Sequence, residues 1–406
     1  MNIKLIEGGV TAAQGFKANG VHAGIRKNRT KKDLALILSS SPAAAAAVYT
    51  TNKVKGAPLL VTKENISDGY ARAIICNSGN ANTCNANGVE IATETCALLA
   101  NELGISEKDV VVASTGVIGQ PLDITPIKDA IPALAFGLSE NGGASAAEAI
   151  MTTDTKLKEI AVSFEIGGKI CKMGAIAKGS GMIHPNMATM LVFITTDCAI
   201  SPEMLQKALS GDVQNTFNMV SIDGDTSTND MVVVLANGAA ENSEITEEGE
   251  DFTAFMTALN TVTVNMCRKI AADGEGATKL LECEVSGALD DKNAKLIAKS
   301  IICSSLTKAA MFGADANWGR ILCAIGYSGA EVNVNGVDVS FKSRAGEIPV
   351  CRCGAGIPFS EEFAKEILSE NEITIVVKLS DGDASSVAWG CDLTYDYVKI
   401  NGDYRT

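Results

Sequence analysis

The amino-acid sequence predicts a mixed α/β (α+β) protein built from two core units. Its 406 residues exceed the roughly 250–300 residues at which a single hydrophobic core usually stops growing, and one large duplex fold is the alternative to two separate cores. Hydrophobic residues make up 46% of the chain and fall in short blocks, which Gly, Asn, Asp and Ser separate. Patterns typical of strands alternate with patterns typical of helices, without a repeat or a heptad. We expect a larger unit over residues 1–285 and a smaller C-terminal α+β unit over residues 286–406.

Short apolar runs predict the strands. Residues 33–38 and 109–113 have the composition of buried strands, and residues 373–377 have that of another. A hairpin is predicted at Asn335-Gly336, because both residues tolerate positive φ and β-rich triplets flank them on either side.

Start signals and apolar spacing predict the helices. Ser201 is expected to be the N-cap of a helix with Pro202 in its first turn. A second helix is predicted over residues 252–272, where apolar residues form one stripe. The segment Asp273-Gly274-Glu275-Gly276 then ends that helix, and Ser360 is expected to cap a third one.

Composition excludes several classes of function. The formal net charge is −14 and no cluster of Lys and Arg stands out, so nucleic-acid binding is not expected. No apolar run approaches the ~20 residues of a membrane span, and the first residues lack the apolar region of a signal peptide, so we expect a cytoplasmic protein. The twelve cysteines are scattered through apolar blocks, and no metal site is predicted from them. With only His22 and His184 available, a nucleophile needs a base other than histidine.

The densest group of chemically interesting residues spans residues 177–197. A Gly-rich loop and a Pro-Asn turn lead into a β-rich run that begins at Thr189. A hydroxyl at this position can attack the carbonyl of Ala188, and the product of that cleavage is an N-terminal threonine. Such a residue supplies both a nucleophile and a base, since an α-amino group has a pKa of about 7.7–8.0. The alternative interpretation is an ordinary loop that enters a buried strand.

A second candidate site follows the strand predicted at 109–113. Thr115 places a hydroxyl beside the backbone N–H of Gly116, and two such donors can form an oxyanion hole. The alternative is a strand-to-helix turn in which Ser or Thr caps the helix.

The acidic segment 223–230 offers carboxylates to a hard cation, but it lacks the spacing of an EF-hand. Capping of the segment by its own Asx and Ser/Thr turns explains its composition better. The sequence also contains neither of the glycine-rich nucleotide-binding loops GxxxxGK[ST] and GxGxxG.

Taken together, these segments resemble the glutamate N-acetyltransferase family of arginine biosynthesis, also called ornithine acetyltransferase, which has a bifunctional branch. The resemblance runs nearly end to end and rests on the ordered segments Gly8–Ala12, Asn77–Asn82, Ser114–Gly119, Met151–Thr155, Lys178–Thr189, Asp223–Asp230, Ala314–Ile321 and Asn401–Thr406. Two departures are Ala316, where the family has proline, and Gly402, where alanine is usual.

The resemblance implies a layered α/β/β/α sandwich of the N-terminal-nucleophile type with a smaller C-terminal unit. It implies self-cleavage between Ala188 and Thr189, which gives an α chain of residues 1–188 and a β chain of residues 189–406 that associate as α2β2. The reaction implied is ping-pong: the enzyme takes an acetyl group from N2-acetylornithine, releases ornithine and passes the acetyl group to glutamate. No cofactor is expected, and acetyl-CoA is left open as a second donor.

The resemblance also implies a role for individual residues. Thr189 is the nucleophile, and the Thr115 side chain and Gly116 N–H form the oxyanion hole. Substrate contacts map to Thr152, Lys178, Thr189, Glu275, Asn401 and Thr406, with Thr153 and Thr155 as neighbouring alternatives to Thr152. From residue type, we expect Lys178 to face a substrate carboxylate and Glu275 to face the ornithine ammonium group.

Two other functions remain open at the level of sequence. An amidase or aminopeptidase with an N-terminal threonine releases the same acyl group to water. An uncleaved binding protein keeps the fold without the chemistry.

Overall fold

The computed structural model describes residues 3–26, 30–184 and 190–403. Contacts divide the chain into two compact units. The first comprises Met1–Gly179, Asn186–Gln214 and Thr226–Met266, and the second comprises Ser180–Pro185, Asn215–Asp225 and Cys267–Thr406. None of the helices in the described part of the chain combines the length and the hydropathy of a membrane span.

The first unit is organised around one sheet, with strand order β1-β6-β7-β8-β10-β3-β4-β5 and β2 paired to β3. Its strands are β1 (Lys4–Ile6), β2 (Phe16–Val21), β3 (Leu34–Tyr49), β4 (Tyr70–Asn77), β5 (Val110–Ser114), β6 (Lys158–Ile166), β7 (Lys169–Lys178), β8 (Leu191–Thr196) and β10 (Met231–Ala236). The strands predicted over 33–38 and 109–113 are confirmed as parts of β3 and β5.

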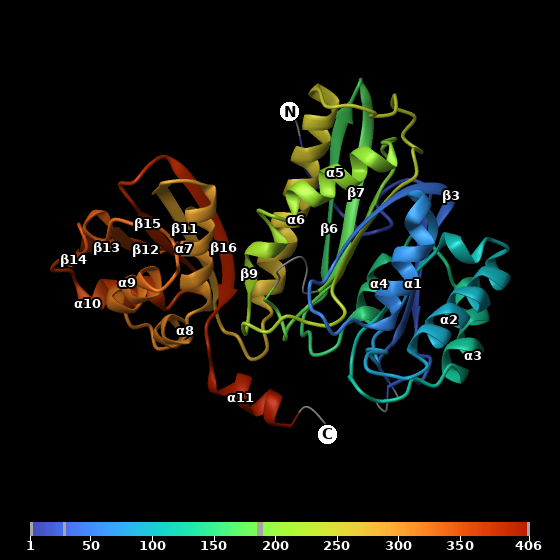
Figure 1. The fold of residues 1–406 in the computed structure, drawn as a ribbon, viewed down its shortest axis with the longest axis horizontal. Helices are drawn as coiled ribbons and strands as arrows, with labels where there is room; N and C mark the ends of the chain where they lie inside the picture. Colours follow the sequence, from blue (N-terminus) through green and yellow to red (C-terminus); the bar gives the residue numbers. More distant parts are fainter. Residues whose placement is uncertain (1–2, 27–29, 185–189, 404–406) are drawn as a thin grey trace. The chain divides into compact units, whose positions relative to one another are not determined.

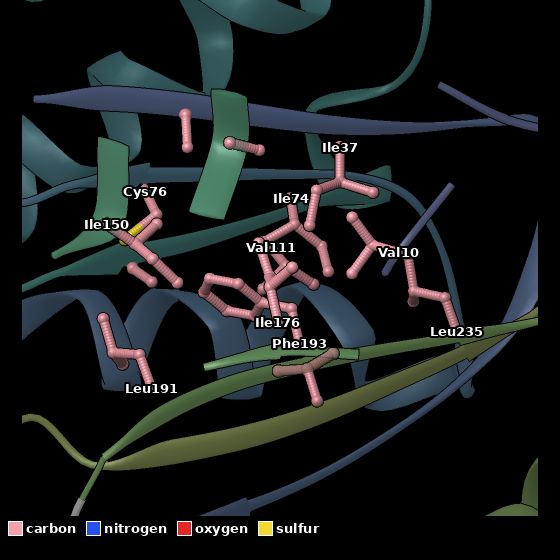
Figure 2. Close-up of a cluster of buried hydrophobic side chains, with 14 of the residues drawn as sticks. Val10, Ile37, Ile74, Cys76, Val111, Ile150, Ile176, Leu191, Phe193 and Leu235 are labelled. Atoms are coloured by element: carbon pink, nitrogen blue, oxygen red, sulfur yellow. The ribbon is translucent and has the colours of Figure 1, made fainter. Parts of the chain in front are cut away.

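Strand β3 divides this sheet into two layers. The first part of β3 pairs with β2 and β4, and its last part, Ala44–Tyr49, pairs with β10. Between Leu38 and Ala43 the register of β3 against β4 shifts. A cluster of buried apolar side chains then lies between the layers, and Figure 2 shows its members from both layers. Ile37, Ile74 and Val111 come from β3, β4 and β5, whereas Ile176, Phe193 and Leu235 come from β7, β8 and β10.

Helices cover the outer faces of both layers (Figure 1). Alternate residues of β3 and β5, such as Leu36 and Val112, face away from the central cluster and pack with the apolar stripes of α2 (Gly88–Leu103) and α3 (Thr125–Phe136). On the other side, α5 (Pro202–Asp212) packs on β3, and α6 (Glu250–Ala272) places Phe255 edge to face with Phe164 of β6. The remaining helices of this unit are α1 (Ala57–Asn65) and α4 (Gly143–Ile150). The α/β/β/α sandwich is therefore confirmed.

The helix starts predicted from capping residues are also confirmed. The Ser201 hydroxyl accepts a hydrogen bond from the N–H of Met204 at the start of α5. The Ser360 hydroxyl does the same for Phe363 at the start of α10 (Glu361–Leu368). The helix predicted over 252–272 is α6.

The second unit contains a sheet with strand order β14-β13-β12-β15-β11-β16-β9. Its strands are β9 (Val220–Ser221), β11 (Leu280–Ala288), β12 (Asp338–Ser343), β13 (Gly346–Arg352), β14 (Ala355–Gly356), β15 (Glu372–Lys378) and β16 (Ala384–Cys391). Helix α7 (Asp291–Cys303) packs on β11 and β16, α10 packs on β12, and the other helices are α8 (Ser305–Phe312), α9 (Trp318–Gly326) and α11 (Tyr395–Gly402). The strand predicted at 373–377 is β15.

Two expectations differ from this architecture. The boundary expected at 285/286 falls inside β11, whose partners β15 and β16 belong to the second unit, so the structural division lies earlier, after Met266. The hairpin predicted at Asn335-Gly336 is wrong. Residues Val334–Gly336 form a 3-10 turn, and the β12–β13 hairpin instead turns between Ser343 and Gly346.

Candidate active site

The predicted oxyanion-hole residues lie at the carboxyl edge of β4 and β5. These two strands are parallel, and Asn77 at the end of β4 is in register with Ser114 at the end of β5. The N–H of Thr115 donates to the Asn77 carbonyl at 2.9 Å, and the Asn77 side-chain amide donates to the Ser114 hydroxyl at 2.6 Å. The loops that leave the two strands are therefore tied together.

Gly116 has a backbone conformation and a neighbourhood that only glycine fits. Its φ is +126°, and a Cβ at this position would lie 2.7 Å from the carbonyl carbon of Gly79 and 2.8 Å from the nitrogen of Asn80. The next helix, α3, begins only at Thr125, and its N-cap Ile124 makes no side-chain capping bond. The alternative in which Ser114 or Thr115 caps a helix is therefore wrong.

Asn229 joins this edge to the second layer of the sandwich. Its side-chain amide donates to the carbonyls of Ala81 and Ser114 at 2.6 and 2.9 Å, and its Oδ1 accepts from the Thr83 hydroxyl at 2.6 Å. Asn229 stands two residues before β10, whose first residue, Met231, donates its N–H to the carbonyl of Met190. The start of β8 and the Thr115–Gly116 loop therefore lie at the same end of the first unit.

Lys178 lies at this same end. It is the last residue of β7, pairs with Leu191 at the start of β8 and is buried. The charge of Lys178 acts on Asp154, a buried carboxylate that accepts from the Lys158 ammonium at 2.6 Å and from the Gly179 N–H at 2.7 Å. Although burial opposes the charge on Asp154, Lys178 and Lys158 hold the pKa of its carboxyl below the ordinary range.

Asp154 also brings Thr152 to Lys178. The N–H of Thr152 donates to Asp154 Oδ2 at 2.9 Å, and its hydroxyl lies 3.5 Å from the same oxygen. The Asp154 carboxylate thus binds both Thr152 and Gly179, the residue after Lys178. Thr153 is partly buried like Thr152, whereas Thr155 is exposed.

Asp230 is a buried acid beside this group. Burial raises the pKa of its carboxyl well above the ordinary value, while Ser227, Lys178 and Thr50 oppose the rise. Its Oδ2 atom has no hydrogen-bond partner among the described residues. The surroundings of Asp230 therefore favour its neutral form.

In the second unit, Glu275 and Asn401 are brought together. The Asn401 amide donates to Glu275 Oε2 at 2.7 Å and also to the Tyr397 carbonyl at 3.0 Å. The Glu275 N–H donates to the Ser180 carbonyl at 2.9 Å. The buried Glu275 carboxylate lies against Gly181, the residue after Ser180. A Cβ on Gly181 would lie 2.4 Å from Glu275 Cδ.

The acidic segment 223–230 contains the expected local turns and two longer connections. The Asp225 N–H donates to Asp223 and the Asn229 N–H to the Ser227 hydroxyl, so the predicted self-capping is confirmed. Asp223 also accepts from Met182 and Ile183, and Asn229 reaches Ala81 and Ser114. Sequence reasoning missed the long-range roles of Asp154, Asp223 and Asn229, although each lies in a polar segment that it had singled out.

The remaining predicted site residues, Ala188, Thr189 and Thr406, lie outside the described residues. Their proposed roles rest on the sequence and on their described neighbours, of which Met190 is the first after Thr189.

Comparison with known proteins places this chain in a family. The sequence model of the ArgJ family matches residues 17–406. The arginine biosynthesis bifunctional protein ArgJ of Caldanaerobacter subterraneus is 50% identical over 405 residues, which cover 100% of both chains. Its counterpart in Bacillus subtilis is 47% identical over 403 residues, 99% of this chain and 97% of the relative. A crystal structure of the Bacillus halodurans protein of the same name is 50% identical with a TM-score of 0.51, and the match covers 53% of this chain and 99% of that chain.

Proposed function

Because this chain belongs to the ArgJ family, it is an acetyltransferase of arginine biosynthesis, and we propose that it transfers acetyl from N2-acetylornithine to glutamate through Thr189. The observation that carries this proposal is the meeting of three elements at one end of the first unit. These are the Thr115–Gly116 loop, Lys178 and the start of β8, the strand that follows Thr189.

Self-cleavage between Ala188 and Thr189 prepares the nucleophile. The Thr189 hydroxyl attacks the Ala188 carbonyl, the peptide C–N bond breaks, and the Ala188 carbonyl is left as an ester on the Thr189 oxygen. Water then hydrolyses this ester, which releases Ala188 as a C-terminal carboxylate and restores the hydroxyl. The freed α-amino group of Thr189, with a pKa of about 7.7–8.0, suits a base near neutral pH. The match to the Bacillus halodurans crystal chain supports this step. The match covers 99% of that chain but only 53% of this one. Residues 189–406 make up nearly the same fraction of this chain, as expected if the matched crystal chain is the piece that begins at the nucleophile.

In the acetyl transfer, the Thr189 hydroxyl attacks the acetyl carbonyl and its α-amino group accepts the proton. The Thr115 hydroxyl and Gly116 N–H donate to the oxyanion that forms. Ornithine leaves with the proton, and the amine of glutamate then attacks the acetyl-threonine, so that N-acetylglutamate is released and the hydroxyl is restored. The left-handed backbone of Gly116 supports this role, because a side chain at this position would displace the neighbouring loop.

We assign the substrate contacts to Thr152, Lys178, Glu275, Asn401 and Thr406. Lys178 carries the positive charge that a substrate carboxylate requires, and Glu275 the negative charge that the ornithine ammonium requires. Both side chains are buried, so an ion pair with substrate is screened less than on the surface.

Intact-mass spectrometry under denaturing conditions tests the nucleophile. We expect two masses that meet between Ala188 and Thr189, and the mass of one acetyl group added to the second piece after N2-acetylornithine is supplied. Thr189→Ala is expected to stay as one chain of 42.2 kDa, and the conservative variant Thr189→Ser to cleave. A single uncleaved mass for the matured wild-type protein contradicts the mechanism.

Product analysis separates transfer from hydrolysis. We expect N-acetylglutamate to appear in step with ornithine, and an amidase would instead release acetate. The relatives carry the name bifunctional, so we propose acetyl-CoA as a second donor to the same threonine. Formation of N-acetylglutamate from acetyl-CoA without N2-acetylornithine checks that activity.

We further propose that the two chains assemble as α2β2 in the cytoplasm. The twelve cysteines are free thiols, as is usual in a reducing compartment. Native mass spectrometry of the matured protein measures the assembly, and a mass of one α and one β chain contradicts it.

A further inference from the structure

The segment that leads to the proposed cleavage bond is held by one carboxylate. Asp223 accepts a hydrogen bond from the Met182 N–H at 2.5 Å and from the Ile183 N–H at 2.8 Å. Met182 has a φ of +57°, which is uncommon for a residue with a side chain. Two successive N–H groups in such a conformation form a concave site for an anion, and the Asp223 carboxylate occupies it.

Neighbouring contacts continue this attachment along the same segment. The Ile222 N–H donates to the Ile183 carbonyl at 2.7 Å, and the His184 ring lies 3.1 Å from the Ser221 hydroxyl. The chain is therefore fixed up to the last residue described before the bond between Ala188 and Thr189.

The same carboxylate also holds the C-terminal helix α11. The Tyr397 hydroxyl donates to Asp223 Oδ2 at 3.3 Å, and burial followed by Asp223 raises the pKa of Tyr397, so that the hydroxyl keeps its proton. One turn later, Asn401 donates to the Tyr397 carbonyl and to Glu275. Tyr397 thus lies between Asp223 and the pair Glu275–Asn401.

A glycine brings α11 close to Glu275. Gly276 has a φ of +69°, and a Cβ there would lie 2.8 Å from the Tyr397 nitrogen. The Gly276 carbonyl also accepts from the Thr394 hydroxyl at 2.7 Å, just before α11 begins. In addition to this close approach of the two backbones, the Tyr397 hydroxyl contacts Asp223 and the Asn401 amide contacts Glu275, and both contacts orient the helix.

We propose that Asp223 and Tyr397 are positioning residues that join the self-cleavage segment to the substrate contacts of α11. This inference rests on the proposed function and assigns two separate effects. Asp223 positions the backbone that leads to the cleavage bond, and Tyr397 positions Asn401 for the substrate.

Two variants separate these effects. Tyr397→Phe removes only the hydroxyl, so self-cleavage stays within about twofold of the wild type while KM for N2-acetylornithine rises about tenfold, as expected for one lost hydrogen bond to a charged group. The kcat value stays within about twofold, because Thr189 and the oxyanion hole are unchanged. Asp223→Asn keeps the shape but turns an NH2 group toward one of the two N–H donors, so self-cleavage slows about tenfold.

Each variant has a matched control in the same element. Tyr395→Phe changes the exposed tyrosine at the start of α11, and Asp225→Asn changes an exposed acid in the same loop as Asp223. Both are expected to match the wild type in cleavage rate, KM and kcat. The measurements are the rate at which the intact mass disappears after synthesis and the kinetics of the matured protein.

A wild-type KM in Tyr397→Phe, or a wild-type cleavage rate in Asp223→Asn, overturns the assignment for that residue. A Tyr397→Phe variant with a lower thermal midpoint and an unchanged KM shows a structural role only, and overturns it as well. Failure of the proposed function is distinct, since the wild-type protein then neither cleaves nor transfers acetyl in the same assays.

Discussion

The side-chain amide of Asn229 donates to the carbonyl oxygen of Ser114 at 2.9 Å, although 115 positions separate the two residues. The same amide donates to Ala81, so Asn229 ties the last residue of β5 to the loop that follows β4. Thr115 and Gly116 of the proposed oxyanion hole follow directly after Ser114. Their position therefore depends on Asn229, which precedes β10.

Replacing Asn229 by alanine is expected to lower the free energy of unfolding by about 2 kcal/mol, because buried carbonyls lose their donor. Acetyl transfer falls at the same time, since the Thr115–Gly116 loop is released. Urea unfolding in the uncleaved Thr189→Ala background measures the stability of a single chain, and kcat of the matured protein measures the activity. The exposed Asn141→Ala is the control, and an Asn229→Ala protein with wild-type stability contradicts the prediction.

Two glycines of the same loop respond differently to alanine. Both have positive φ. A Cβ added at Gly116 would meet the backbone of Gly79 and Asn80, whereas a Cβ added at Gly119 would meet no atom of the described residues within 4 Å. Gly116→Ala is expected to reduce kcat about 100-fold, the size of a lost oxyanion-hole donor. Gly119→Ala costs about 1–2 kcal/mol of backbone strain and keeps most of the activity. Equal kcat values for the two variants argue against this placement of the oxyanion hole.

The ion pair between Asp154 and Lys158 is buried, so removal of one partner leaves an uncompensated charge. Asp154→Asn is expected to reduce the free energy of unfolding by about 3–5 kcal/mol. The double variant Asp154→Asn/Lys158→Met is expected to cost less than the two single changes together. Urea unfolding in the uncleaved background provides all three values, with the exposed Asp129→Asn as a control. Additive costs show that the two side chains do not interact.

His184 is expected to make stability depend on pH. Burial, followed by the charge of Lys299, lowers its pKa from 6.5 to about 4. Because the unfolded chain binds the proton more tightly, the contribution of His184 to stability is complete above about pH 6.5 and is lost as the pH falls toward 4. The thermal midpoint of the wild type is therefore expected to fall more steeply from pH 7 to pH 4.5 than that of His184→Gln. The control is His22→Gln at the exposed second histidine, and parallel curves for the wild type and His184→Gln contradict the prediction.

Local chemistry explains which elements could be predicted from the sequence. Ser201 and Ser360 cap their helices through hydrogen bonds to residues three positions later, so all the information lies in one short segment. The prediction of a hairpin at Asn335-Gly336 was wrong because distant residues decide the conformation there. Asn333 donates its N–H to Asp381, and Gly336 packs against Ser380, so contacts with a distant segment select a 3-10 turn there.

The sequence by itself determined the α/β alternation, the helix caps and the ordered polar motifs, because each depends on neighbouring residues. The tertiary structure alone decided which motifs meet: Asp154 with Gly179, Asp223 with Met182 and Asn229 with Ser114. The physical reason is that a buried amide or carboxylate must find hydrogen-bond partners. Those partners are supplied by strand order and register, which bring together residues that are far apart along the chain.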